Sequence, residues 1–346
     1  MKQIFIKSLT VILVILLLSN VTAMKISASP DDLNSDEYEV LLDGIPITSQ
    51  AAVIIDFATG LVVYEFNASE QRVPASMTKM AAAYVVFDAI RDGFAGFDTM
   101  LEITEEASRF SYVRAYSNVP MPMGSSYTVR ELLDVVIVRS ASAATISLGE
   151  GLFGSEEALV DKMNEKAEQL GIAALFHDSW GGSPDNRISA SGMAELTRSF
   201  IKEHPEILEI TSQKSVLFDE REYASTNPLL STYDGVDGFK TGYTRPAGWC
   251  FTSTAEINGR RLITVTMGSV QGSRFPDTVV LLDYGFSYYN ITIAGHFRNS
   301  IINSLDIFHT SGTPLVPISL YKNIYEAQYI DIRDLAVILN ETERND

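Results

Sequence analysis

Residues 235–250 read GVDGFKTGYTRPAGWC, and β-rich runs separated by turns follow them. Trp249–Ala255 and Arg261–Met267 are rich in residues that favour strands. The pair Asn258-Gly259 between them is a strong hairpin signal, because both residues tolerate the positive φ angles of a tight turn. This part of the chain therefore predicts antiparallel strands, with Lys240-Thr241-Gly242 at the edge of one strand.

The N-terminal half adds a second hairpin and a helical middle. Ala51–Phe57 and Leu61–Phe66 flank a glycine-containing turn, which is typical of a hairpin. Helices are expected from Lys79 to Ile90, over Thr128–Ile137, where a capping box is spaced correctly, and over Glu156–Leu170. An early hairpin, a helical middle and late antiparallel strands predict an α+β domain.

Composition excludes several classes of protein. The 346 residues allow two or three domains at about 100–200 residues each. The net charge of −18 argues against nucleic-acid binding, which needs a basic face. A single cysteine, Cys250, cannot form an intrachain disulfide, and the four histidines lack metal-ligand spacing. A zinc hydrolase is therefore not expected, and hydrolytic chemistry would rest on Ser, Lys, Asp or Glu.

The N-terminal segment of the chain predicts export. Lys2 and Lys7 precede the apolar run Leu9–Leu18, and small residues follow, so residues 1–28 are interpreted as a secretory signal peptide. An uncleaved N-terminal anchor is the alternative. Residues 29–44 resemble a flexible leader, 45–290 a catalytic domain and 291–346 a small C-terminal extension. The polar end NETERND predicts no C-terminal membrane anchor. The protein is expected to work outside the cytoplasmic membrane.

Three short segments carry candidate chemistry. Ser76 and Lys79 stand three residues apart, which on a helix places an amine beside a hydroxyl and lets it act as the base. Lys240-Thr241-Gly242 can bind a carboxylate through charge and a hydrogen bond, with close backbone approach at the glycine. Ser140-Ala141-Ser142 offers a second serine that could relay a proton. Each segment alone also occurs by chance.

Together, the order of these segments resembles the S-x-x-K, S-x-N and K-T-G signature of penicillin-binding proteins and serine β-lactamases. The chain is most similar to the D-alanyl-D-alanine carboxypeptidases of peptidase family S11. Matching segments lie over about residues 45–290, and they are Pro74–Lys79, Tyr127–Val138, Met163–Gly171, Gly235–Cys250 and Leu281–Phe286. The resemblance implies a β-lactamase/transpeptidase-like fold, in which helices flank an antiparallel sheet.

The resemblance also implies the reaction. Ser76 would attack the D-Ala-D-Ala peptide carbonyl and form an acyl-enzyme, with Lys79 as general base and Ser140 shuttling a proton to the departing D-alanine. The partners would be peptidoglycan stem peptides, whose trimming limits cross-linking, and β-lactam antibiotics that acylate Ser76. The resemblance implies no metal or cofactor.

Substrate binding is implied for the other motif residues. Lys240 and Thr241 would hold the terminal carboxylate, beside Gly242, and the backbone N–H groups of Ser76 and Tyr243 would form the oxyanion hole.

One position departs from the family pattern. Ser142 stands where the family has the asparagine of S-x-N. An asparagine amide both donates and accepts hydrogen bonds, whereas serine is shorter and has one donor. Losing one such contact costs about 1–3 kcal/mol. The alternative function is therefore a catalytically weak homologue that binds cell-wall peptides. Endopeptidase or β-lactamase activity on the same acyl-enzyme is a further alternative.

Overall fold

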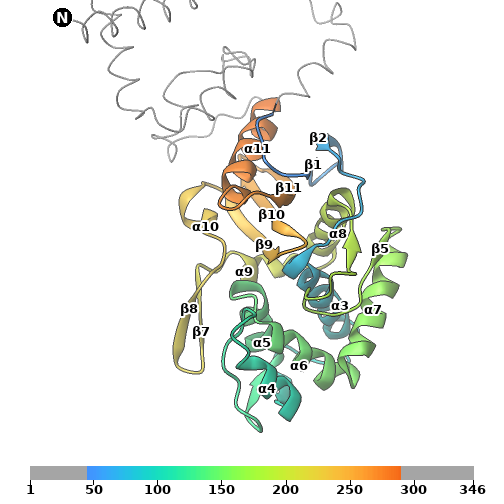
Figure 1. Cartoon of the computed structure of the whole chain (residues 1–346), viewed down its shortest axis with the longest axis vertical. Coiled ribbons are helices and arrows are strands. Elements are labelled where there is room, and N and C mark those ends of the chain that lie inside the picture. Colours follow the sequence, from blue (N-terminus) through green and yellow to red (C-terminus); the bar gives the residue numbers. More distant parts are fainter. Residues whose placement is uncertain (1–44, 290–346) are drawn as a thin grey trace, which may run out of the picture. The chain divides into compact units, whose positions relative to one another are not determined.

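The computed structural model describes residues 45–289, and all structural statements below concern this part of the chain (Figure 1). The signal peptide, the leader and the C-terminal extension predicted from the sequence lie outside the described residues. None of the helices within 45–289 combines the length and the apolar character needed to cross a membrane.

The elements run in this order. The first half contains β1 (Ala51–Asp56), β2 (Val62–Phe66), the 3₁₀ turn η1 (Ala75–Thr78), α3 (Lys79–Arg91), β3 (Met100–Glu102), α4 (Glu105–Ser111), β4 (Ser126–Thr128), α5 (Val129–Val138), α6 (Ser142–Phe153) and α7 (Glu156–Gln169). The second half contains β5 (Ala174–Leu175), β6 (Arg187–Ile188), α8 (Ala190–Glu203), α9 (Ile207–Thr211), β7 (Ser215–Phe218), β8 (Arg221–Ala224), α10 (Leu229–Thr232), β9 (Val236–Thr244), β10 (Gly248–Ile257), β11 (Arg260–Ser269) and α11 (Arg274–Tyr288).

The main sheet is antiparallel and has the order β2-β1-β11-β10-β9. Both predicted hairpins are confirmed: β1 pairs with β2, and β10 pairs with β11 across the Asn258-Gly259 turn. The first strand also pairs with the last, so that Val53 faces Val265. This order leaves β9 at one edge of the sheet, with one side free to meet the helical part of the molecule.

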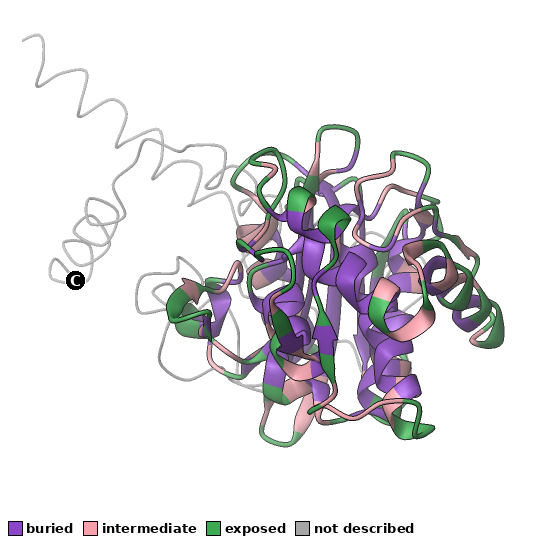
Figure 2. Ribbon diagram, turned by 90° about the horizontal axis from the view of Figure 1, so that it is seen from below, coloured by how far each residue is buried: buried purple, intermediate pink, exposed green. Residues whose placement is uncertain are grey.

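Each face of the sheet packs on helices. Along β1 the side chains alternate, so that Val53 joins the core beneath α3 and α8 whereas Ile54 joins the core beneath α11 (Figure 1). Leu281 and Phe286 of α11 are fully buried against the second face. Buried residues accordingly run through the sheet and the inner faces of the helices (Figure 2). The α+β fold predicted from the sequence is confirmed.

The helical middle also follows its sequence signals. The Thr128 side chain accepts from the Glu131 N–H, and Glu131 accepts in return from the Thr128 N–H, so the predicted capping box forms at the start of α5. The run after Lys79 forms α3, whose residues are almost all buried. The turn η1 ahead of α3 packs against β9, and α5 ends at Val138, two residues before Ser140, so the candidate residues gather near the free edge of β9.

Candidate active site

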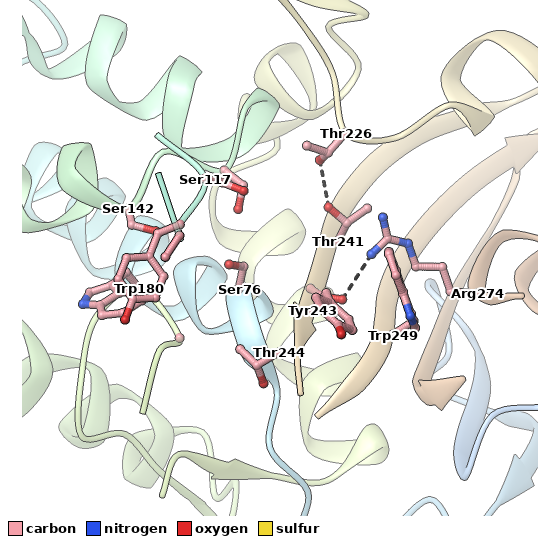
Figure 3. A pocket seen from close by; sticks show the side chains of 15 residues that line it. Ser76, Ser117, Ser142, Trp180, Thr226, Thr241, Tyr243, Thr244, Trp249 and Arg274 are labelled. Carbon is pink, nitrogen blue, oxygen red and sulfur yellow. Dashed lines mark hydrogen bonds between the residues drawn. The ribbon is translucent and has the colours of Figure 1, made fainter. Parts of the chain in front are cut away.

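A cavity of about 260 Å³ lies between the edge of β9 and the helical part (Figure 3). Six residues expected from the sequence line it, namely Ser76, Ser140, Ser142, Thr241, Gly242 and Tyr243. Lys79 and Lys240 do not line the cavity, because both side chains are buried behind its wall. The three segments expected to carry chemistry are thus brought together.

Ser76 lies in the 3₁₀ turn that leads into α3, rather than in the α-helix itself. The preceding Ala75 is fully buried and has φ +50°, a left-handed conformation that a non-glycine residue adopts only under constraint. Two glycines close in on this peptide. A Cβ on Gly181 would lie 2.0 Å from the Ala75 oxygen, and one on Gly242 would lie 2.8 Å from the Pro74 oxygen. The packing therefore holds the nucleophile segment in place.

The Lys79 amine lies within hydrogen-bond reach of the Ser76 hydroxyl. Its Nζ lies 3.0 Å from Ser76 Oγ and donates to the Trp180 carbonyl at 2.6 Å. Burial lowers the pKa of the Lys79 amine to about 7, although the carboxylates of Asp178 and Glu156 act in the opposite direction. About half of the molecules would therefore carry a neutral amine near pH 7, and only a neutral amine can accept a proton.

The second serine segment begins α6. Ser140 has φ +65°, and its buried Oγ finds no hydrogen-bond partner among residues 45–289. A buried hydroxyl without a partner is costly, so this group is available for a bound molecule. Ser142 is also buried, and its N–H donates to the Ser117 carbonyl at 2.9 Å. The Ser117 and Ser142 side chains both face the cavity (Figure 3).

Arg274 makes the opposite wall of the cavity cationic, and Lys240 is buried behind that wall. Lys240 Nζ donates to the Thr241 carbonyl at 3.1 Å, and burial together with the charges of Lys79 and Arg274 holds the pKa of Lys240 well below its usual value. Arg274 lies 4.8 Å from the Trp249 ring centroid and donates to the Gly242 carbonyl at 3.1 Å. Burial lowers the pKa of Arg274 to about 10, so this side chain stays charged at neutral pH.

Aromatic rings flank Ser76 on both sides. Tyr116 packs on Trp180 with ring centroids 4.7 Å apart, and Tyr243 packs on Trp249 at 4.4 Å. Figure 3 shows Trp180 on one side of Ser76 and the Tyr243–Trp249 pair on the other. The cavity walls therefore suit a ligand with apolar surface and an anionic end.

Sequence reasoning missed several residues of this cavity. Arg274 stands at the start of α11, about 30 residues beyond the K-T-G segment. The Thr226 hydroxyl accepts a hydrogen bond from the Thr241 hydroxyl at 2.8 Å. Ser117 lies in the loop between α4 and β4. None of the three stands in a recognisable motif, so only their position in the fold identifies them. Cys250 lies in the predicted strand and is buried there.

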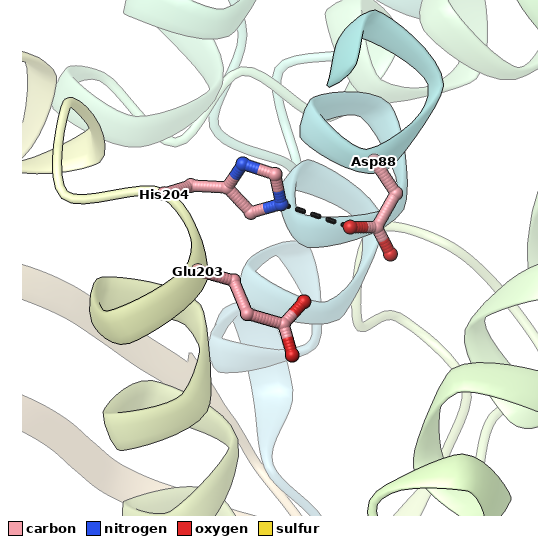
Figure 4. Close-up of side chains that lie close together, drawn as sticks. All are labelled: Asp88, Glu203 and His204. Atoms are coloured by element: carbon pink, nitrogen blue, oxygen red, sulfur yellow. Dashed lines mark hydrogen bonds and ion pairs between the residues drawn. The ribbon is translucent and has the colours of Figure 1, made fainter. Parts of the chain in front are cut away.

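Three titratable side chains outside this cavity lie close together: Asp88, Glu203 and His204 (Figure 4). His204 Nε2 lies 2.8 Å from Asp88, whose two oxygens also pair with Arg91 and Lys166. Because cations already neutralise Asp88, we interpret the group as a structural tie between α3, α7 and α8. We assign no metal to it.

An α+β fold with a serine and a lysine at the head of a helix, facing an edge strand with K-T-G, defines the penicillin-recognising serine enzymes. The family model described as D-alanyl-D-alanine carboxypeptidase, peptidase family S11, matches residues 39–271. The chain therefore belongs to this family, and the resemblance noted in the sequence is confirmed.

Individual relatives agree with this assignment. The chain is 31% identical over 249 residues to the D-alanyl-D-alanine carboxypeptidase DacF of Bacillus subtilis (strain 168), and 30% identical over 257 residues to DacC of Escherichia coli (strain K12). These matches cover 70% and 72% of this chain, and 63% and 64% of the relatives. The chain thus matches somewhat less than two thirds of the length of these relatives.

Solved structures show the same fold. A peptidoglycan synthesis regulatory factor (PBP3) from Streptococcus pneumoniae is 32% identical with a TM-score of 0.67, over 70% of this chain and 74% of that one. Penicillin-binding protein D2 from Listeria monocytogenes, solved in its ampicillin-bound form, is 30% identical with a TM-score of 0.62, over 69% of this chain and 98% of that one.

Proposed function

We propose that this chain is a serine-type D-Ala-D-Ala carboxypeptidase that removes the terminal D-alanine from peptidoglycan stem peptides. The observation that carries the proposal is the 3.0 Å separation between Lys79 Nζ and Ser76 Oγ at the floor of the cavity. A base within hydrogen-bond reach of a nucleophile is the geometry that covalent catalysis needs. The names of the relatives indicate the substrate class.

Acylation follows from this placement. Lys79 takes the proton of Ser76 as Oγ bonds to the carbonyl carbon of the penultimate D-alanine. The N–H groups of Ser76 and Tyr243 would stabilise the oxyanion. The carbon–nitrogen bond then breaks, and the proton held by Lys79 passes through the Ser140 hydroxyl to the departing amine. The buried and unpartnered Ser140 Oγ supports this relay.

Deacylation reverses the proton path. Lys79 takes a proton from water, the hydroxide oxygen bonds to the acyl carbon, and the bond to Ser76 Oγ breaks as Oγ regains its proton. A β-lactam would acylate Ser76 by the same first step. The Listeria relative solved with ampicillin supports this part of the proposal.

Substrate binding would use the edge of β9. A peptide can add to the free side of an edge strand through backbone hydrogen bonds. Its terminal carboxylate would then lie against Thr241 and Arg274, with Lys240 buried behind the wall. Charge-assisted hydrogen bonds to these groups are stronger than neutral ones, so they would favour a peptide with a free carboxylate. The predicted signal peptide would bring the enzyme to this substrate outside the cytoplasmic membrane.

The second candidate function is a catalytically weak homologue that binds cell-wall peptides. The observation that favours it is Ser142, which reaches the cavity with a short hydroxyl where the family has a carboxamide. Ser117 also faces the cavity and could contribute a second hydroxyl there (Figure 3).

The deciding experiment compares the mass of the purified chain, with and without Ser76→Ala, after incubation with penicillin. A stable adduct only in the unchanged protein, together with release of D-alanine from a D-Ala-D-Ala peptide, is expected. An adduct without D-alanine release would favour the weak homologue. A folded protein that forms no adduct would contradict the enzyme assignment.

A further inference from the structure

The loop between β5 and β6 is held from inside by the carboxylate of Asp178. Its Oδ1 accepts from the Gly181 N–H at 2.7 Å and from Asn186 Nδ2 at 2.9 Å. Its Oδ2 accepts from the N–H groups of Gly182, at 2.8 Å, and of Ser183. Four donors thus converge on one side chain. A carboxylate can satisfy all four, whereas an amide of the same shape cannot.

This loop contacts the nucleophile segment at several points. The Trp180 carbonyl accepts from Lys79 Nζ at 2.6 Å, and Gly181 lies directly against the peptide before Ser76. Asn186 Nδ2 lies 3.3 Å from Thr78 Oγ1. The position of the loop therefore decides where the lysine amine and the serine hydroxyl lie relative to each other.

The orientation of the amine matters for the chemistry. A neutral lysine has two N–H groups and one lone pair, and only the lone pair can take a proton from a hydroxyl. A carbonyl oxygen can only accept, so the Trp180 carbonyl engages an N–H group of Lys79 and leaves the lone pair free for Ser76. If the Trp180 carbonyl moved, the lone pair of the Lys79 amine would no longer point toward Ser76.

We propose that Asp178 is a positioning residue for the reaction: by holding the Trp180 carbonyl in place, it orients the Lys79 amine toward Ser76. The proposal rests on the proposed function of the Ser76–Lys79 pair. Asp178 does not line the cavity, so it acts through the loop.

Charge gives Asp178 a second, separable effect. The charged groups that face Lys79 are the carboxylates of Asp178 and Glu156, which raise the pKa of the amine, and Lys240 on β9, which repels it. Within the described residues, Glu156 accepts hydrogen bonds from the Ser179 N–H and hydroxyl alone, both through Oε1. Glutamine can keep that acceptor, so Glu156→Gln removes charge while leaving the hydrogen bonds of Asp178 intact.

The test measures the rate constant of Ser76 acylation by penicillin between pH 5 and 10, in the full chain. At the high-pH plateau Lys79 is neutral in every variant, so the plateau reports orientation and the midpoint reports charge. For Asp178→Asn we expect a plateau lowered by about tenfold or more and a midpoint at lower pH. For Glu156→Gln we expect the midpoint to move to lower pH and the plateau to stay within about twofold.

A third variant changes the geometry of the loop without changing its charge. Asn186→Ala changes no charge, but it removes one donor to Asp178, the contact with Thr78 Oγ1, and the acceptor of the His177 and Asp178 N–H groups. The plateau should therefore fall while the midpoint stays in place. Penicillin affinity before acylation should be unchanged in all three variants. Thermal unfolding confirms that each is folded at the assay temperature.

The possible results distinguish the two proposals. An unchanged plateau in both Asp178→Asn and Asn186→Ala would overturn the positioning role while leaving the enzyme assignment intact. An equal plateau loss in Glu156→Gln would also overturn it, because charge alone would then explain the effect. Failure of the unchanged protein to be acylated would instead overturn the proposed function itself.

Discussion

Replacing Arg274 by glutamine should weaken recognition of a free C-terminal carboxylate. Arg274 faces the cavity and donates to the Gly242 carbonyl at 3.1 Å, while its buried Nε has no hydrogen-bond partner among residues 45–289. One charge-assisted hydrogen bond contributes about 1.5–3 kcal/mol. Its loss would lower kcat/KM for a D-Ala-D-Ala peptide by roughly 10- to 150-fold.

The assay compares two peptides, one ending in a carboxylate and one in a carboxamide. The carboxamide peptide has no charge for the guanidinium to bind, so Arg274→Gln should lower its hydrolysis by less than about threefold. Arg274→Lys keeps the positive charge and should retain part of the preference. Because Arg274 also packs on Trp249, thermal unfolding must show that the variant is folded. Equal losses with both peptides would refute the assignment of Arg274 to carboxylate binding.

Four other predictions concern separate parts of the molecule. Ser142→Asn supplies the missing amide and should raise D-alanine release by less than about tenfold if the native relay is intact. An increase in D-alanine release of about a hundredfold or more would show that the native site is disabled. The acylation rate should rise with pH through a midpoint near pH 7, the pKa of Lys79, and should be about one hundredth of its plateau value at pH 5. A rate that does not change with pH would contradict a lysine base. Gly181→Ala places a Cβ 2.0 Å from a carbonyl oxygen at a residue with φ +87°, so penicillin labelling should be lost; a labelled variant with normal thermal stability would contradict this packing. Burial raises the pKa of Asp283, which accepts from the Tyr233 hydroxyl, to about 7. The folded form then binds the proton more tightly than the unfolded chain, so stability should fall by up to roughly 4 kcal/mol between pH 4 and 7 and then level off. Urea unfolding of Asp283→Asn should show a flatter pH dependence, and an equally steep one would refute the role of this carboxyl.

Local sequence signals account for the parts of the fold that were predicted. The Asn258-Gly259 turn and the capping box at Thr128 depend on residues within a few positions of one another, and both form as expected. The S-x-x-K spacing likewise placed Lys79 beside Ser76, although the turn there is 3₁₀ rather than α-helical.

The remaining parts of the site depend on long-range packing. Arg274 reaches the cavity because α11 crosses back over the sheet, and no spacing along the chain indicates this. The burial of Lys240 behind the wall, rather than in the cavity, follows from the tertiary structure around β9. Asp178 stands in an irregular loop, where neither helical nor strand periodicity marks a functional side chain.

The pairing of β1 with β11 has a consequence for how the domain forms during synthesis. The first strand emerges from the ribosome early, but its central partner is one of the last elements to appear. Until then β1 can pair only with β2, and an isolated two-stranded hairpin is marginally stable at best. The nascent chain is thus expected to stay largely unfolded until almost the whole domain has been made. Contacts so distant in sequence also slow folding. A chain that folds late and slowly stays suited to threading through a narrow translocation channel.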